Sequence, residues 1–193
     1  MTRGNRRRIG VIGLGNMGGA LAQSLLRAGH PTWGFDIDGT RFERFEAEGG
    51  HRTSSPADVA ASCDTLITSL PSIRALEEVV AGDGGLLTVG RPGLVVIETS
   101  TLPIDAKEAA RENLRSISAV VLDCPVSGTA AQARVGDLVV FASGDRTAVD
   151  RVAWVFETVG RSWHFVGDFG VGSKMKYVAN LLAFIHVTAA AEA

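Results

Sequence analysis

Cysteine and lysine are scarce in this chain of 193 residues, which has two cysteines and three lysines. The two cysteines, Cys63 and Cys124, lie far apart, and neither has a Cys or His neighbour at metal-ligand spacing. The sequence therefore offers no disulfide framework and no metal site. Both cysteines are predicted to be small, buried, apolar residues in a reducing compartment.

Long uncharged apolar runs and a strong net charge are also missing. No stretch of about 18 apolar residues is free of charge, which predicts no membrane span. The apolar segment after the N-terminal tail is short and Gly-rich and has no cleavage site of small residues, so we expect no signal peptide and a cytoplasmic protein. A net charge of -2 does not favour nucleic acid, and the basic cluster in residues 1–8 is interpreted as a solvated tail.

What the sequence does contain is a repeated switch between short apolar runs and helical periodicity. This alternation predicts an α/β fold with a doubly wound, mostly parallel sheet of the Rossmann type, covering residues 9–167. The predicted strands are 8–13, 32–36, 65–70, 95–98, 120–123, 138–142 and 164–166. The predicted helices are 16–29, 41–48, 56–61, 73–80, 103–115 and 146–159.

Residues 168–193 differ from the rest. From about Lys174 the sequence reads as a long helix that is apolar nearly all round and has no Gly, Asn or Pro stop signal. We expect it to be the start of an all-α domain that is missing from this chain. An apolar helix of this kind favours association, so the sequence predicts a homo-oligomer formed through the helical region.

A glycine-rich turn follows the first predicted strand and opens the first helix. Gly13, Gly15 and Gly18 have the G-x-G-x-x-G spacing, in which the glycines permit a tight turn, close approach of a pyrophosphate, and packing of helix on strand. The amides at the helix start favour an anion. This pattern predicts a dinucleotide site rather than a merely structural turn, with cofactor contacts from Gly13, Leu14, Gly15, Asn16, Met17 and Gly18.

An acidic residue stands where such a site needs one. Asp36 ends the second predicted strand, about 20 residues beyond the glycines, where a carboxylate accepts hydrogen bonds from ribose hydroxyls and repels a 2'-phosphate. This position favours NAD over NADP, although Arg41 lies one helical turn later. Asp38 is the alternative ribose ligand, or else a cap for the helix that begins near Thr40.

Five motifs in order resemble those of the β-hydroxyacid dehydrogenases, typified by 3-hydroxyisobutyrate dehydrogenase and related to 6-phosphogluconate dehydrogenase. They are "GLGNMG" (13–18), "SLPS" (69–72), "ETSTLP" (98–103), "DCPVSGTAAQARVGDL" (123–138) and "GVGSKMKYVANLL" (170–182). The resemblance spans nearly the whole chain. It implies a dinucleotide-binding domain, then a long helix, and then an all-helical domain.

The resemblance also implies roles for residues after the later strands. Leu70 and Pro71 border the cofactor in proteins of this kind, and Ser100 and Thr101 lie beside the nicotinamide ribose. The substrate carboxylate is held by the turn that corresponds to Ser127, Gly128 and Thr129. Thr129 replaces a second glycine of the family, and a β-branched residue disfavours a positive φ.

Two lysines compete for one catalytic role. The family's catalytic lysine precedes an asparagine by four residues, a condition that Lys176 meets with Asn180 and Lys174 does not. Positions i and i+4 share a helix face, so these two side chains can converge on one small ligand. Lys176 is therefore predicted as the general acid/base, with Asn180 orienting it or the substrate. Lys174 is predicted to be solvated.

The resulting prediction is an NAD-dependent oxidoreductase that transfers a hydride between nicotinamide and a small 3-hydroxy acid. Two alternatives remain at this point: a non-catalytic NAD-binding module, and an enzyme like the imine reductases. A pure binding module has no need of Lys176 or Asn180, and imine reductases usually lack a lysine at the catalytic position.

Overall fold

A computed structural model describes residues 7–193, so most of the predicted basic tail, residues 1–6, lies outside the described residues. The chain forms one mostly parallel sheet in the order β3-β2-β1-β4-β5-β6-β8-β7, with β9 paired to β8. The pairs from β3 to β6 are parallel, whereas β8 runs antiparallel to β6 and β7. The predicted doubly wound α/β class is confirmed. The strands are β1 (Ile9–Ile12), β2 (Thr32–Phe35), β3 (His51–Arg52), β4 (Thr65–Thr68), β5 (Val95–Glu98), β6 (Val120–Asp123), β7 (Val126–Ser127), β8 (Leu138–Ser143) and β9 (Gly160–Gly167).

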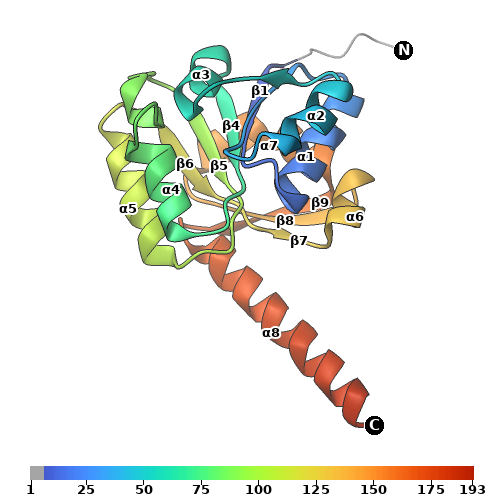
Figure 1. Ribbon diagram of the computed structural model, residues 1–193. Helices are drawn as coiled ribbons and strands as arrows, with labels where there is room; N and C mark the ends of the chain where they lie inside the picture. The colour runs from blue at the N-terminus through green and yellow to red at the C-terminus, as the bar shows by residue number, and fades with distance from the viewer. Residues whose placement is uncertain (1–6) are drawn as a thin grey trace.

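Helices cover both faces of the sheet (Figure 1). One apolar core lies under α1 and α7 and includes Leu25 and Phe156; the other lies under α3, α4 and α5 and includes Leu76 and Leu114. Strands between two helical layers are covered on both faces, which explains why every residue of β1, β4 and β5 is buried. The helices are α1 (Asn16–Arg27), α2 (Thr40–Ala47), α3 (Pro56–Ser62), α4 (Ile73–Ala81), η1 (Leu86–Thr88), α5 (Ile104–Arg115), α6 (Ala130–Arg134), α7 (Arg146–Val159) and α8 (Val171–Glu192).

Predicted start and stop signals account for several helix ends. Ser55 accepts the backbone N–H of Asp58 at the start of α3, and Asp145 accepts that of Ala148 at the start of α7. Gly29, just beyond α1, has φ +85°, the left-handed conformation expected of a glycine stop.

Four short elements, β3, β7, α6 and η1, were not predicted, and the predicted last strand is too short. β3 and β7 have two residues each and α6 has five, lengths at which neither alternation nor helical periodicity is visible in a sequence. β9 spans eight residues instead of three. Its register against β8 shifts twice, which interrupts the two-residue alternation by which strands are recognised.

Helix α8 points away from the body of the molecule (Figure 1). Its first turn contacts the sheet, and beyond it the apolar side chains are uncovered, with Met175 41%, Leu181 59% and Phe184 70% exposed. The burial that its sequence predicts is thus not provided by the rest of residues 7–193. Association through this surface stays a prediction. Within residues 7–193, none of the helices combines the length and hydropathy of a transmembrane segment.

Both cysteines are buried and unpaired, as predicted. Burial raises the pKa of the Cys63 thiol to about 12 and also raises that of Cys124. Because the thiolate is the reactive form, we expect neither thiol to react with Ellman's reagent at pH 8 in the native chain, and both to react at once after unfolding in urea. Rapid release of the reagent's chromophore from the folded protein would contradict this assignment.

Candidate functional site

Four parallel strands end in register at one edge of the sheet. Ile12 lies opposite Thr68, Thr68 opposite Glu98, and Glu98 opposite Asp123. The segments that leave these strands carry the predicted cofactor and substrate residues, so the fold brings them to one edge. Carboxyl ends of parallel strands are where ligands bind in open α/β sheets.

The glycine turn between β1 and α1 is shaped by two positions where a side chain does not fit. Gly13 has φ +89°, and a Cβ there would lie 2.3 Å from the carbonyl oxygen of Ser69. A Cβ on Gly18 would lie 1.8 Å from the carbonyl oxygen of Gly13. At Gly15, in contrast, the nearest atom is a guanidinium nitrogen of Arg41 at 3.4 Å. A Cβ would therefore fit at the one glycine that is expected to face a pyrophosphate, with no backbone atom against it.

This contrast predicts different outcomes for two alanine variants. Gly18→Ala places a methyl group inside backbone van der Waals distance, so the free energy of unfolding should fall by about 3 kcal/mol. Gly15→Ala should fold with nearly unchanged stability, because its φ of -62° suits alanine, yet it should bind NADH at least tenfold more weakly. Urea unfolding and NADH fluorescence titration measure the two quantities. Unchanged NADH affinity in Gly15→Ala would exclude a cofactor at this turn.

Asp36 is fixed against the turn by three donors. Its carboxylate accepts the N–H of Leu14 at 2.6 Å, the N–H of Asp38 at 2.9 Å and the guanidinium of Arg41 at 2.9 Å. Asp38 itself accepts the N–H and hydroxyl of Thr40, the first residue of α2, but the N-cap of this helix is Gly39, not Asp38. Of the two aspartates, Asp36 is the one held at the glycine turn.

Two hollows flank the turn. The larger, of about 420 Å³, is lined by Gly13, Asp36, Leu70 and Pro71 among others. A dinucleotide needs an open cleft, an anion-accepting helix start and a ribose acceptor, and the residues present fit that need. Leu70, at this cleft, is tied to the predicted segment after β5, since it donates its N–H to the hydroxyl of Ser100 at 2.8 Å. Thr101, the next residue, is exposed.

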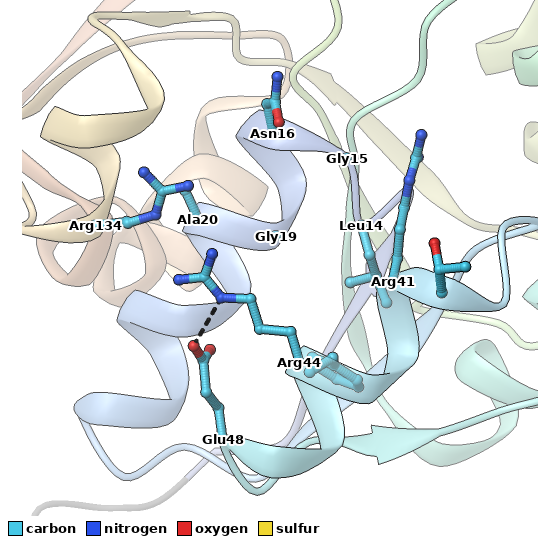
Figure 2. Close-up of a pocket in the computed structure, with 11 residues that line it drawn as sticks. Leu14, Gly15, Asn16, Gly19, Ala20, Arg41, Arg44, Glu48 and Arg134 are labelled. Atoms are coloured by element: carbon cyan, nitrogen blue, oxygen red, sulfur yellow. Dashed lines mark hydrogen bonds and ion pairs between the residues drawn. The ribbon is translucent and has the colours of Figure 1, made fainter.

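The second hollow, of about 330 Å³, lies between α1, α2 and α6 and is drawn in Figure 2. Three arginines line it, of which Arg44 pairs with Glu48 at 3.2 Å and Arg41 with Asp36. Arg134, from the unpredicted helix α6, faces α1 from the other side. Sequence reasoning missed Arg44 and Arg134, because only the fold brings α6 beside α1. The groove adds positive charge next to the helix start.

The predicted substrate turn follows β7. Gly128 has φ +136°, whereas Thr129 has φ -100° and is the N-cap of α6, where its hydroxyl and Gln132 form a capping box. Thr129 therefore avoids the positive φ that a β-branched residue disfavours. The positive φ falls on Gly128, and threonine at the next position is a favourable helix cap.

Lys176 lies in the second turn of α8. It is half-buried, and loss of contact with water lowers its pKa, because burial disfavours the charged amine. Lys174 is exposed, as predicted, and Asn180 lies one turn beyond Lys176. Among residues 7–193 no hydrogen bond joins Lys176 or Asn180 to the turn at Ser127.

Two features near α8 were not predicted. The hydroxyl of Tyr177 donates to the carbonyl of Leu102 at 2.5 Å, which ties α8 to the segment after β5. Lys107 is fully buried between Glu98 and Asp123. The only signal for the latter in the sequence is that Lys107 is one of three lysines in a chain that otherwise uses arginine.

Comparison with known proteins agrees with this geometry. Residues 8–167 match the NAD binding domain of 6-phosphogluconate dehydrogenase. An L-threonate dehydrogenase from Cupriavidus necator is 38% identical over 97% of this chain and 63% of its own length. The crystal structure of a 3-hydroxyisobutyrate dehydrogenase from Salmonella typhimurium superposes with a TM-score of 0.87 and 32% identity, covering 96% of this chain and 65% of that one.

An imine reductase from Myxococcus stipitatus has a TM-score of 0.89 at 17% identity, covering 97% of this chain and 64% of that one; at this identity the likeness shows the fold alone. The chain spans less than two thirds of the length of the proteins it matches here. Two findings identify the family: the match of residues 8–167 to the NAD binding domain, and the similarity to an L-threonate dehydrogenase. The chain therefore belongs to the β-hydroxyacid dehydrogenases, the family that shares the NAD binding domain of 6-phosphogluconate dehydrogenase.

Proposed function

We propose that this chain is the cofactor-binding part of an NAD-dependent dehydrogenase of small 3-hydroxy acids, in which Lys176 is the general acid/base. The observation that carries the proposal is a half-buried lysine with a lowered pKa, on a helix that starts beside the carboxyl ends of the strands. An amine of this kind can take a proton from a hydroxyl group and return it. Exposed lysines such as Lys174 have no comparable setting.

The chain's own residues divide the work between binding and proton transfer. Gly15 leaves room for a pyrophosphate at the start of α1, and Asp36 supplies an acceptor for ribose hydroxyls. The nicotinamide supplies the hydride chemistry when it is bound. Ser127 and Gly128 offer a hydroxyl and a backbone N–H for a carboxylate, with Thr129 beside them. Asn180 orients the Lys176 amine or the substrate.

The substrate class is proposed from the relatives and from the donors. L-threonate and 3-hydroxyisobutyrate, named for two relatives, are both small hydroxy carboxylates, which suits a turn that offers hydrogen-bond donors to an anion. NAD is proposed over NADP because a carboxylate after the second strand suits ribose hydroxyls and repels a 2'-phosphate, and because Arg41 is already paired with Asp36 and Asp38.

The test is an assay of the complete protein that contains this chain. It is mixed with NAD or NADP and a panel of small 3-hydroxy acids, 2-hydroxy acids and amines, and nicotinamide absorbance is followed. The proposal expects turnover of a 3-hydroxy acid, with kcat/KM at least tenfold higher for NAD. Turnover of amines alone would favour an imine reductase, and cofactor binding without any turnover would favour a binding module.

A further inference from the structure

A cluster of charges is buried between the sheet edge and α8, outside the cofactor cleft. Glu98, Lys107, Asp123 and Ser173 are each no more than 1% exposed. The Lys107 ammonium lies 2.8 Å from a carboxylate oxygen of Glu98, 2.9 Å from one of Asp123 and 3.0 Å from the Ser173 hydroxyl. The members come from β5, α5, β6 and α8, so the cluster joins four elements.

The Lys107 amine keeps its positive charge in this setting. Burial by itself lowers the pKa of Lys107, but the two carboxylates outweigh burial and the pKa is raised. The ammonium thus lies between two carboxyl groups, each of which also accepts a backbone N–H. Buried ion pairs of this kind add little net stability, since replacing them with apolar residues of similar volume often leaves the folded protein equally stable. A positional role explains better why charge is placed here.

One end of the cluster reaches the cofactor cleft. The other oxygen of Glu98 accepts the N–H of Ser100 at 3.0 Å and also the Ser100 hydroxyl. That same hydroxyl accepts the N–H of Leu70 at 2.8 Å. Through Ser100, Glu98 thus holds Leu70, which lines the cofactor cleft.

The other end holds the start of α8. The cap residue of this helix is Gly170, which has no side chain to satisfy the first amides. Asp123 accepts the N–H of Ser173 at 2.7 Å and its hydroxyl at 2.8 Å, and Ser143 accepts the N–H of Gly172 at 3.0 Å. A carboxylate at a helix N-terminus also interacts favourably with the helix dipole. Asp123, fifty residues before Ser173 in the sequence, therefore accepts the hydrogen bonds that a cap side chain would otherwise accept.

We propose that Glu98, Lys107, Asp123 and Ser173 form a positioning element that holds Lys176 at a fixed place relative to the Leu70–Ser100 side of the cofactor cleft. Ser173 and Lys176 are three residues apart, and therefore neighbours on the helix surface. The cluster holds both the start of α8, which carries Lys176, and Leu70 in the wall of the cleft. The distance between Lys176 and that wall is therefore fixed. The proposal rests on the function assigned to Lys176, but its structural half can be measured without turnover.

The test compares Ser173→Ala with the parent chain. The variant removes one donor to Asp123 and one acceptor for Lys107 and leaves the backbone anchor in place. We expect amide hydrogen exchange in residues 171–177 to accelerate at least tenfold. The pKa of Lys176, measured from the pH dependence of amine labelling with Lys174 as internal reference, should rise toward that of an ordinary lysine as water returns. NADH affinity should stay within twofold.

Two further variants separate positioning from general stability. Ser173→Thr keeps a hydroxyl and should restore both readouts, whereas Val152→Ala truncates a buried α7 side chain remote from α8 and should lower the melting temperature without changing either readout. If Ser173→Ala does not fold, Ser143→Ala tests the same anchor. Unchanged exchange and an unchanged Lys176 pKa in a folded Ser173→Ala chain would overturn the proposal.

Turnover of the complete protein then distinguishes the catalytic role proposed for Lys176 from the anchoring proposed for α8. The positioning role predicts that kcat falls about tenfold in Ser173→Ala while KM for NAD is unchanged. If hydrogen exchange and the pKa of Lys176 change but kcat does not, the catalytic role of Lys176 is refuted and the anchoring of α8 stands. If neither hydrogen exchange nor the pKa of Lys176 changes, the anchoring is refuted, whatever the value of kcat.

Discussion

Lys176→Ala in the complete protein should lower kcat for oxidation of the 3-hydroxy acid by a factor on the order of 10²–10⁴. The reason is that the hydroxyl proton must leave as the hydride leaves, and in our proposal no other side chain receives it. NADH affinity should remain nearly the same, because our proposal assigns cofactor binding to the glycine turn and Asp36, away from Lys176. Rapid-mixing and steady-state absorbance assays measure the rate, and fluorescence titration measures the affinity.

Lys174→Ala is the matched control, since it removes an exposed lysine one half-turn away and should leave kcat within twofold. The rate should also depend on pH in a defined direction. Oxidation requires the neutral amine, so kcat/KM should rise with pH along a limb whose midpoint is the pKa of Lys176. That midpoint should lie below the ordinary lysine value of about 10.4, because burial lowers the pKa of Lys176. A parent-like rate in Lys176→Ala would refute the assignment.

The parts of this molecule that follow from short-range rules could be predicted from sequence. Strand runs, helix caps and the glycine turn are each decided by residues within about ten positions of one another, so Gly18 against Gly13 or Asp145 capping α7 is visible in the printed chain. The sheet edge also followed, because parallel strands put their carboxyl ends together.

What sequence reasoning missed depends on pairs of residues that are distant along the chain. Asp123 caps a helix fifty residues later, and Arg134 faces a groove whose other wall is α1 and α2. Thr129 was judged by analogy with glycine, although its neighbour Gly128 carries the unusual backbone angle. The burial of Lys107 could not be predicted, because nothing local shows that α5 turns this residue toward two carboxylates.

Lys107→Met should be among the most destabilising single changes in the chain, lowering the free energy of unfolding by about 3–5 kcal/mol. The methionine fills a similar volume, so the loss does not come from a cavity. It comes from leaving Glu98 and Asp123 buried as two like charges with no cation between them. Urea unfolding followed by circular dichroism measures the difference. A matched surface pair is the control: Arg74→Met, whose partner is Glu78, should cost less than about 1 kcal/mol, because both side chains are exposed.

A double variant then tests the cause. Lys107→Met with Glu98→Gln removes one of the two buried negative charges and keeps an oxygen that can accept the N–H of Ser100. If uncompensated charge is the source of the loss, the double variant should be more stable than Lys107→Met alone, although it carries one more substitution. Additive destabilisation would mean that shape and hydrogen bonding, rather than charge, decide the stability of the cluster, and a loss under about 1 kcal/mol in Lys107→Met would mean that water reaches it.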